Sequence, residues 1–243
     1  MKILTDVHTH TNASSHAYST LYENMYAAKK RGLELVAMTN HAPSIIDAPH
    51  IWHFMYFKAL PRVIEGVRLM CGVEANILDK NASLDMPESV LSDMEVVIAS
   101  IHPPTYKEER GGDHTETWLN VIDNEYVDIL GHTGSPDYPF DIDAVVRRAK
   151  EKNKCIEINN HSFISRPQNI EICREIALAC KKYETPVVVN SDAHFMDRIG
   201  EVSKATEMLE EIGFPQKLIM NLTAERFIEY ISKKKDRVFK FDE

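Results

Sequence analysis

Seven short apolar segments alternate with stretches of helical periodicity along this 243-residue chain, and this alternation limits the folds that it can form. Several segments lack the apolar and polar alternation of a half-exposed strand, so we expect strands that are covered on both faces. Such strands occur in parallel sheets, where a helix usually connects each strand to the next. The predicted strands are Ile3–Val7, Leu35–Thr39, Leu69–Glu74, Val96–Ile101, Val127–Leu130, Cys155–Asn159 and Val187–Asn190.

Amphipathic helical patterns lie between several of these strands and after the last one. They cover Tyr22–Lys30, Ala144–Lys152, Ile170–Tyr183, Val202–Ile212 and Ala224–Lys233. An open, doubly wound sheet would show the same alternation, but no GxGxxG or GxxxxGK[ST] phosphate loop follows a strand. The chain length suits one (β/α) barrel of roughly 250 residues. We therefore predict a single α/β domain over residues 1–243, with its last helices within residues 201–235.

Composition narrows the possible partners and the location. The formal net charge of −9 argues against a surface for long nucleic acids, although a small phosphate ester needs only a local cationic pocket. No segment approaches the ~20 apolar residues of a membrane span, and the N-terminus does not resemble a signal peptide. The four cysteines form no CxxC pair, and we expect buried, reduced thiols in a cytoplasmic protein. The sequence leaves the oligomeric state open.

Potential metal ligands stand at or just after most of the predicted strands. The carboxyl ends of the strands meet at one face of a barrel, so these donors should converge. A buried core histidine explains any one of them but not their recurrence. Histidine and carboxylate ligands without thiolates favour Zn²⁺, Mn²⁺ or Fe²⁺, and nine donors imply two or three ions with a bridging carboxylate. The nine donors, which lie between residues 6 and 194, are His8, His10, His16, His41, Glu74, His102, His132, Asp192 and His194.

Three acidic or basic residues near these donors have predicted supporting roles. Asp6 has the same parity as His8 and His10 on an extended strand, so we expect its carboxylate to accept the free N–H of a ligand imidazole. Arg166 follows the sixth predicted strand and Arg198 follows the seventh. Both can reach the barrel mouth and bind phosphate oxygens, with surface salt bridges as the alternative.

Other polar residues near the predicted mouth have simpler interpretations. His161 is expected to be a loop residue or a support for a ligand, because the nine donor positions are filled without it. His50, Trp52 and His53 are expected to form one wall of the pocket, with ordinary packing under a long loop as the alternative for Trp52 and His53. The stretch Gly111–His114 is predicted to be a solvated surface loop. The run Lys233–Lys235 is predicted to be a solvated helix end, where positive charge suits the helix dipole.

Several of these residues stand in motifs that resemble the PHP (polymerase and histidinol phosphatase) family. The motifs are DxHxH at residues 6–10, SHA at 15–17, TNH at 39–41, GVEAN at 72–76 and NSDAH at 190–194. The similarity runs from residue 3 to about residue 200 and is closest to the stand-alone bacterial phosphatases, which share a DAPHxWHF loop and an EINN strand. The resemblance implies a distorted (β/α)7, TIM-like barrel that holds a trinuclear centre, usually of zinc.

The resemblance also implies an assignment of the donors to ions. The first ion is held by His8, His10, Glu74 and Asp192; Glu74 bridges to a second ion with His102 and His132; the third ion is held by His16, His41 and His194. Glu74, Asp192 and His194 are then the metal-held catalytic residues. Two neighbours depart from the family pattern. Asn40 replaces a usual Asp and removes a charge beside His41 that would bear on the third ion, and Thr133 replaces a common Pro.

A cluster of this kind is suited to hydrolysis of a small phosphomonoester. Close metal ions generate hydroxide from water near neutral pH and neutralise phosphoryl oxygens, so no protein nucleophile is required. Phosphodiester cleavage of short nucleotides is an alternative for the same centre. An amidohydrolase is a second alternative, but Glu74 stands where its carboxylated lysine would be expected. A non-catalytic zinc domain is disfavoured because structural zinc is normally closed by four donors, often thiolates. Histidinol phosphate, sugar phosphates, pyridoxal phosphate and nucleotides remain open as substrates.

Overall fold

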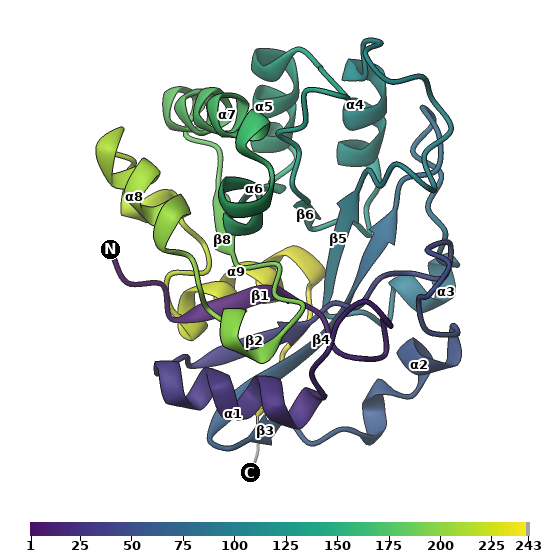
Figure 1. Cartoon of the computed structure of the whole chain (residues 1–243), viewed down its shortest axis with the longest axis vertical. Coiled ribbons are helices and arrows are strands. Elements are labelled where there is room, and N and C mark those ends of the chain that lie inside the picture. Colours follow the sequence, from purple (N-terminus) through teal and green to yellow (C-terminus); the bar gives the residue numbers. More distant parts are fainter. Residues whose placement is uncertain (242–243) are drawn as a thin grey trace.

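Seven parallel strands form a nearly closed barrel in the computed structural model, which describes residues 1–241 (Figure 1). The strand order is β1-β2-β4-β5-β6-β7-β8, and the short β3 pairs antiparallel with β4. The predicted single-domain (β/α)7 barrel is therefore confirmed. The strands are β1 Thr5–Thr9, β2 Leu35–Met38, β3 Val63–Ile64, β4 Val67–Asn76, β5 Val96–Ser100, β6 Ile129–Leu130, β7 Cys155–Asn159 and β8 Val187–Asn190.

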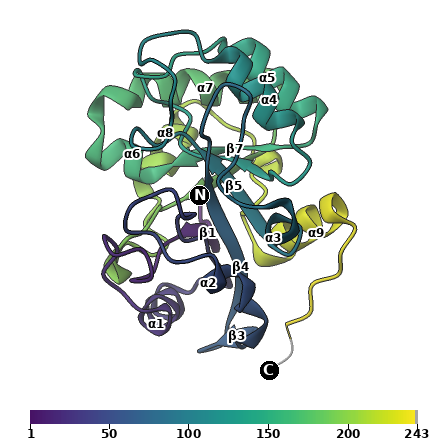
Figure 2. The same ribbon diagram turned by 90° about the vertical axis from the view of Figure 1, so that its right-hand side faces the viewer.

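Helices surround the barrel and connect its strands. Helices α4, α5 and α7 lie together on one side, and α1 lies on the opposite side (Figures 1 and 2). Short 3₁₀ turns (η1 Phe57–Ala59, η2 Pro167–Asn169, η3 Met196–Arg198 and η4 Gln216–Leu218) lie in the connections. The helices are α1 Leu21–Arg31, α2 Trp52–Met55, α3 Glu88–Leu91, α4 Thr115–Asp123, α5 Ile142–Glu151, α6 Asn160–Ser165, α7 Ile170–Tyr183, α8 Ser203–Glu211 and α9 Ala224–Lys235.

Local sequence signals explain why several helices begin where they do. Thr20 caps α1 in a capping box with Glu23, and Gly32 ends the same helix in the left-handed conformation with φ of 72°. Asp141 caps α5, since its carboxylate accepts the N–H of Ala144 at 3.0 Å. Strands β7 and β8 and helix α7 have the bounds that the sequence predicted. Strand β3 and helices α2, α3, α4 and α6 were not predicted, and all but α4 are six residues or shorter.

The barrel closes between β1 and β8 without a regular ladder. Thr9 forms an isolated parallel bridge with Ala193 near the carboxyl ends of these strands. In the same gap, the side chain of Asn221 donates to the carbonyl of Val189 at 2.7 Å and to that of Thr5 at 3.3 Å. Side-chain amide groups therefore satisfy backbone groups that a ladder would otherwise pair.

The interior of the barrel leaves no space for side chains at some positions. An added Cβ at Gly131 would lie 2.1 Å from Ser100 Oγ and 2.7 Å from Ile98 Cγ2. Only glycine fits this close approach of β5 and the segment after β6. The next residue is His132, so the close approach determines where this predicted ligand enters the site.

Helix α9 packs against the interior residues of the barrel. Phe227 and Ile231 are fully buried in the same apolar cluster as strand residues that face the barrel interior. At the end of the helix, Lys234 and Lys235 both pair with the buried carboxylate of Asp128, the latter at 2.9 Å. The prediction of a solvated Lys233–Lys235 run is therefore wrong for these two residues, because α9 packs onto the barrel and its last turn meets Asp128.

Two further expectations concern the cysteines and membrane-spanning segments. All four cysteines are buried and unpaired, as predicted. No helix within residues 1–241 is both long and apolar enough to cross a membrane.

Candidate metal centre

All nine predicted donors lie together at the carboxyl ends of the strands, and we call this set the donor cluster. Strand β1 carries His8 and places His10 just beyond its end, while Glu74 lies on β4. The remaining six donors lie in loops that follow strands. Each donor is within 3.6 Å of another, measured between ring nitrogens or between a ring nitrogen and a carboxylate oxygen. The structure thus brings together the side chains that strand ends alone indicated.

Four donors of the cluster have the spacing of one tetrahedral site. His8 Nε2 is 3.4 Å from Glu74 Oε2 and 3.6 Å from Asp192 Oδ1, and His10 Nε2 is 3.5 Å and 3.2 Å from the same two atoms. Tetrahedral zinc with ligand bonds of about 2.0–2.1 Å has ligand-to-ligand edges of about 3.3 Å. These four atoms can therefore contact one cation without rearrangement of the backbone.

The second carboxylate oxygen of Glu74 faces a different pair of ligands. Glu74 Oε1 is 3.3 Å from His102 Nε2 and 3.0 Å from His132 Nε2. One carboxylate thus directs one oxygen to each of two donor groups, and Oε2 also lies 2.7 Å from His41 Nδ1, a donor predicted for the third ion. This is the arrangement expected of a carboxylate that bridges two ions.

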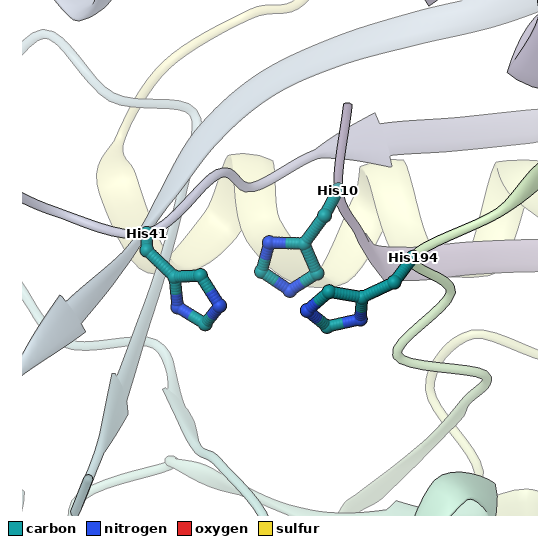
Figure 3. A group of neighbouring side chains, drawn as sticks. All are labelled: His10, His41 and His194. Atoms are coloured by element: carbon teal, nitrogen blue, oxygen red, sulfur yellow. The ribbon is translucent and has the colours of Figure 1, made fainter. Parts of the chain in front are cut away.

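The remaining histidines lie beside His10. His16 Nε2 and His41 Nε2 are 3.1 Å apart. His10, His41 and His194 point toward one another, and nitrogens of all three lie within 4.8 Å (Figure 3). The ring of His10 is 4.3 Å, between centroids, from each of the other two. His10 therefore lies between the donors predicted for the first ion and those predicted for the third.

Several buried polar atoms of the donor cluster have no hydrogen-bond partner. They are His8 Nε2, both ring nitrogens of His10, His41 Nδ1 and Glu74 Oε2. An unsatisfied buried polar group costs about 1–3 kcal/mol. These atoms are four imidazole nitrogens and one carboxylate oxygen, and His8 Nε2, His10 Nε2 and Glu74 Oε2 lie close enough together for one cation to satisfy all three. The donor set thus fits divalent metal ions.

The charge states of three donors, His10, Glu74 and Asp192, suit metal binding. Burial by itself raises the pKa of Glu74 and Asp192, but the facing histidines outweigh it and hold both pKa values well below their usual range. Burial, together with His41 and His194, lowers the pKa of His10 well below its usual value. Burial by itself lowers the pKa of His8, but Glu157, Glu74 and Asp192 outweigh it and hold that pKa well above its usual value. Ionised carboxylates and neutral imidazole are the forms that bind metal ions, so metal binding at His8 must displace a proton.

Glu157 on β7 orients two of the donors, and the sequence prediction missed it. Its Oε1 accepts a hydrogen bond from His8 Nδ1 at 2.7 Å, and its Oε2 accepts the backbone N–H of His132 at 2.8 Å. The signal was present, since a fully buried strand rarely contains an acidic residue unless it is paired. Glu157 directs His8 Nε2 toward Glu74 and fixes the backbone at His132.

The role predicted for Asp6 is therefore wrong. Its carboxylate accepts hydrogen bonds from Ser191 Oγ and from the backbone N–H groups of Ser191 and Gly200. The physical reason is an irregularity in β1, whose register against β2 shifts between Asp6 and Thr9. The shift interrupts the strict alternation of faces on which the prediction depended.

Two other ligand imidazoles are oriented by oxygen atoms from neighbouring segments. His102 Nδ1 donates to Asn76 Oδ1 at 2.7 Å, and His16 Nδ1 donates to Asp47 Oδ2 at 2.8 Å. Both contacts leave Nε2 facing the cluster, as supporting hydrogen bonds to ligands usually do. Neither partner was predicted, although both stand in the motifs that resemble the PHP family.

Two predicted ligands have left-handed backbones. The φ angle is 27° at His132 and 56° at Asp192, a region that non-glycine residues seldom occupy. Such conformations cost on the order of 1–3 kcal/mol and persist where surrounding contacts enforce them. The hydrogen bonds from His132 N to Glu157 and from Asp192 N to the carbonyl of His8 supply such contacts.

The two departures from the family pattern lie in different surroundings. Asn40 Oδ1 accepts the backbone N–H of Thr11 at 2.7 Å, and Asn40 Nδ2 donates to His53 Nε2 at 3.1 Å. Asn40 thus contacts a loop residue and His53, and no hydrogen bond joins its side chain to His41 in the described chain. Thr133 lines a cavity beside the cluster.

A cavity of about 360 Å³ lies over the donor cluster, and we call it the mouth cavity. Besides donors, its walls include His161 and Arg166. Arg166 forms no ion pair with any residue between 1 and 241. Arg198 is exposed, lies 3.6 Å from Asp197, and lines an adjacent cavity of about 410 Å³.

One predicted surface residue is buried. His114 is 3% exposed, and its Nδ1 is 3.0 Å from the hydroxyl oxygen of Tyr106. The prediction of a solvated loop is wrong at this position, because His114 directly precedes α4 and packs between Tyr106 and Tyr138. Gly111 and Gly112 before it are exposed, as predicted.

The sequence is similar to known proteins over nearly its whole length. The sequence matches the family described as the PHP domain over residues 6–234. This chain belongs to the PHP family. Among curated relatives of this PHP protein, a protein named probable phosphatase from Acetivibrio thermocellus is 44% identical over 238 residues, which cover 98% of this chain and 99% of the relative. A probable phosphatase from Clostridium novyi is also 44% identical, over 235 residues and 96% of each chain.

A solved structure resembles this PHP protein in fold. It is the histidinol phosphate phosphatase of Lactococcus lactis in complex with zinc, L-histidinol and phosphate. The TM-score is 0.64 with 18% identity, and the match covers 88% of this chain and 95% of the other. At this identity the likeness supports the barrel architecture, while the donor cluster supports the chemistry.

Proposed function

We propose that this protein is a metal-dependent phosphatase that hydrolyses a small phosphomonoester. The observation that carries the proposal is the bridging geometry of Glu74, whose two oxygens face two separate groups of ligands. Curated relatives of the same length are named as phosphatases, which agrees with this chemistry.

Zinc is the cofactor that fits best, with two or three ions for each chain. Imidazole and carboxylate donors suit Zn²⁺, and Mn²⁺ or Fe²⁺ are acceptable to the same set. The structural relative from Lactococcus lactis was solved with zinc. When bound, such ions supply hydroxide near neutral pH and neutralise phosphoryl oxygens. In this proposal the nine donors would hold the ions, with Glu74 shared by the first two and His16, His41 and His194 at the third.

The residues of the chain position the substrate. Arg166 lines the mouth cavity without a carboxylate partner, so its planar guanidinium is available to bind two phosphate oxygens. Arg198 is a second candidate, but its contact with Asp197 competes for the same group. Glu74, Asp192 and His194 act through the ions that they hold. No protein side chain is required as a nucleophile.

The cavity and charge favour a small substrate. The mouth cavity of about 360 Å³ is in the range of pockets for small molecules. The net charge of −9 opposes binding of long polynucleotides, which depends mainly on clustered basic residues. A small phosphomonoester is therefore favoured over a nucleic acid strand.

Phosphate release from a panel of small monoesters tests the proposal. We expect activity that chelation abolishes and that zinc or manganese restores. The matched variant His8→Ala should lose the activity and retain a circular dichroism spectrum like that of the wild type. A diester such as bis-p-nitrophenyl phosphate should be a much poorer substrate. Metal-loaded protein that releases no phosphate from any monoester would overturn the proposal.

A further inference from the structure

A second cavity, which we call the side cavity, opens beside the donor cluster. It has a volume of about 210 Å³, and His102 and His132 form part of its wall. Trp118 on α4 and Asn169 at the end of η2 line other parts of it. Arg166 lines both the side cavity and the mouth cavity. A group in the side cavity is therefore adjacent to a phosphate at the donor cluster.

The wall of the side cavity contains one fully buried hydrogen-bond donor without a partner, on Trp118, and a buried amide side chain, on Asn169. Trp118 is 1% exposed, and its Nε1–H meets no acceptor in the described chain. Asn169 is 2% exposed, and its side-chain amide makes no hydrogen bond within residues 1–241. An unsatisfied buried N–H costs about 1–3 kcal/mol. A ligand with acceptor oxygens in this cavity would remove that cost.

The charge of the wall indicates which acceptor fits. Arg166 contributes a positive charge that no carboxylate of the described residues pairs with. Asp137 is the acidic residue among the lining residues, and it faces Arg110 at 3.6 Å. The uncompensated charge at this wall is therefore positive. A neutral sugar would satisfy the N–H donors but leave the charge of Arg166 unmatched.

We propose that the side cavity binds a second oxyanion of the substrate, carried on the alcohol half of the phosphomonoester. The inference rests on the proposed phosphatase function, and it narrows the substrate class to esters that bear a carboxylate or a further phosphate. Arg166 presents a planar fork that matches either group, and the N–H groups of Trp118 and Asn169 bind the remaining oxygens. A cavity of about 210 Å³ admits such a group with a short linker.

The cavity of about 410 Å³ on the other side of the mouth lacks this combination. Its large apolar residues Tyr18, Ile164 and Phe195 are exposed, and its arginine, Arg198, pairs with Asp197. No buried donor without a partner lines it in the described chain. The side cavity is therefore the better candidate for recognition of a charged group.

Two pairs of esters test the inference with the zinc-loaded enzyme. The pair 3-phosphoglycerate and glycerol 3-phosphate differs in a carboxylate, and the pair fructose 1,6-bisphosphate and fructose 6-phosphate differs in a second phosphate. A hydrogen bond to a charged group corresponds to about a 10-fold to 100-fold effect. We expect kcat/KM to be at least about 10-fold higher for the doubly anionic member of one pair. The pair that shows the effect identifies the oxyanion, and equal values within both pairs overturn the inference.

Variants locate the effect in the side cavity. Trp118→Phe removes the indole N–H and retains an aromatic ring, and Asn169→Ala removes the amide. Each should reduce the selectivity ratio within the discriminating pair by about 10-fold. Phe195→Leu, on the other side of the mouth, is the matched control and should leave that ratio unchanged. If Trp118→Phe does not fold, as judged by circular dichroism, Asn169→Ala still decides the result. An unchanged ratio in a folded variant refutes the assignment to this cavity.

A binding experiment separates this inference from the proposed function. Calorimetry compares phosphonoacetate with ethylphosphonate, neither of which needs to be hydrolysed. We expect the zinc-loaded protein to prefer phosphonoacetate, or the corresponding bisphosphonate, and Asn169→Ala to lose the preference. If this preference appears but no ester releases phosphate, the phosphatase proposal fails and the side cavity assignment stands. If all esters release phosphate but the two phosphonates bind with equal affinity, the phosphatase proposal stands and the side cavity assignment fails.

Discussion

Glu157→Gln should weaken metal binding although Glu157 belongs to no predicted ligand set. The carboxylate accepts four hydrogen bonds: from His8 Nδ1 at 2.7 Å, Asn190 Nδ2 at 2.8 Å, the backbone N–H of His132 at 2.8 Å and Asn159 Nδ2 at 3.1 Å. Glutamine keeps the size of the side chain but has one acceptor oxygen. Its amide nitrogen must face two of the four donors.

Either orientation of the new amide disturbs one ligand. If its nitrogen faces His8, the imidazole must accept at Nδ1 and place its proton on Nε2, which is the atom that faces Glu74 and Asp192. If its nitrogen faces His132, the backbone N–H loses its acceptor at a residue with φ of 27°. The first orientation affects the first predicted ion, and the second orientation affects the second ion.

The expected loss is 10-fold to 100-fold in metal affinity, the usual range for residues that orient ligands. This corresponds to about 1.4–2.7 kcal/mol of binding free energy. Competition with a chromogenic chelator measures the zinc dissociation constant, and elemental analysis measures the number of ions retained after dialysis. We expect at least one ion to be lost from Glu157→Gln under conditions in which the wild type retains it.

Glu95→Gln is the matched control for this change. Glu95 is also a buried carboxylate, and it accepts the backbone N–H of Cys71 at 2.8 Å and an N–H of Arg62 at 2.8 Å, at the amino end of β5. The variant Glu95→Gln should lower the free energy of unfolding without changing zinc affinity. Zinc affinity of Glu157→Gln within about twofold of the wild type would refute the reasoning, and an equal loss in Glu95→Gln would assign the effect to general destabilisation.

Three further changes have defined outcomes. Gly131→Ala should lower the free energy of unfolding by about 1–3 kcal/mol in urea titrations, because the new Cβ would lie 2.1 Å from Ser100 Oγ. Gly112→Ala is the control and should have little effect, because its nearest contact would be 3.4 Å. Equal free energies of unfolding for the two variants would contradict the close approach at Gly131. Burial lowers the pKa of Lys154 to about 7, so between pH 7 and the normal value near 10.5 the unfolded state binds more protons and stability should rise with pH. Lys154→Met should remove this rise, and parallel stability profiles for the two proteins would show that Lys154 does not cause it. Arg166→Gln should lower kcat/KM more than about 10-fold, and Arg198→Gln much less because Asp197 already engages Arg198; the reverse order in steady-state assays would exchange their proposed roles.

The predicted donors came together because their recognition needed only local information. A residue at the end of a parallel strand lies at the same face as the ends of all other strands, whatever the order of those strands. His102 and His132 therefore required no knowledge of which elements are neighbours. The partners that orient the donors did require it, since Glu157 on β7 reaches His8 on β1 across the barrel.

The wrong predictions have the same origin, because they also depended on contacts between segments that are distant in sequence. The role of Asp6 was inferred from strict alternation along β1, and a register shift against β2 interrupts that alternation. Lys234 and Lys235 were predicted to be solvated because basic residues in the last turn of a helix are usually exposed to solvent. Here α9 packs onto the barrel, and the carboxylate of Asp128 comes from a segment over 100 residues away. His114 was missed for a similar reason, because Tyr106 and Tyr138 enclose it only after the loops have packed.

The sequence by itself predicted the barrel class, the single-domain organisation and the set of potential donors, because apolar runs, helical periods and strand ends are local properties of the chain. Tertiary structure decided which oxygen of Glu74 faces which histidines, which buried carboxylate orients His8, and which arginine stays unpaired beside the mouth. These are distances of a few ångströms between residues remote in sequence. They depend on strand register, on barrel closure and on the packing of loops, which no local pattern specifies.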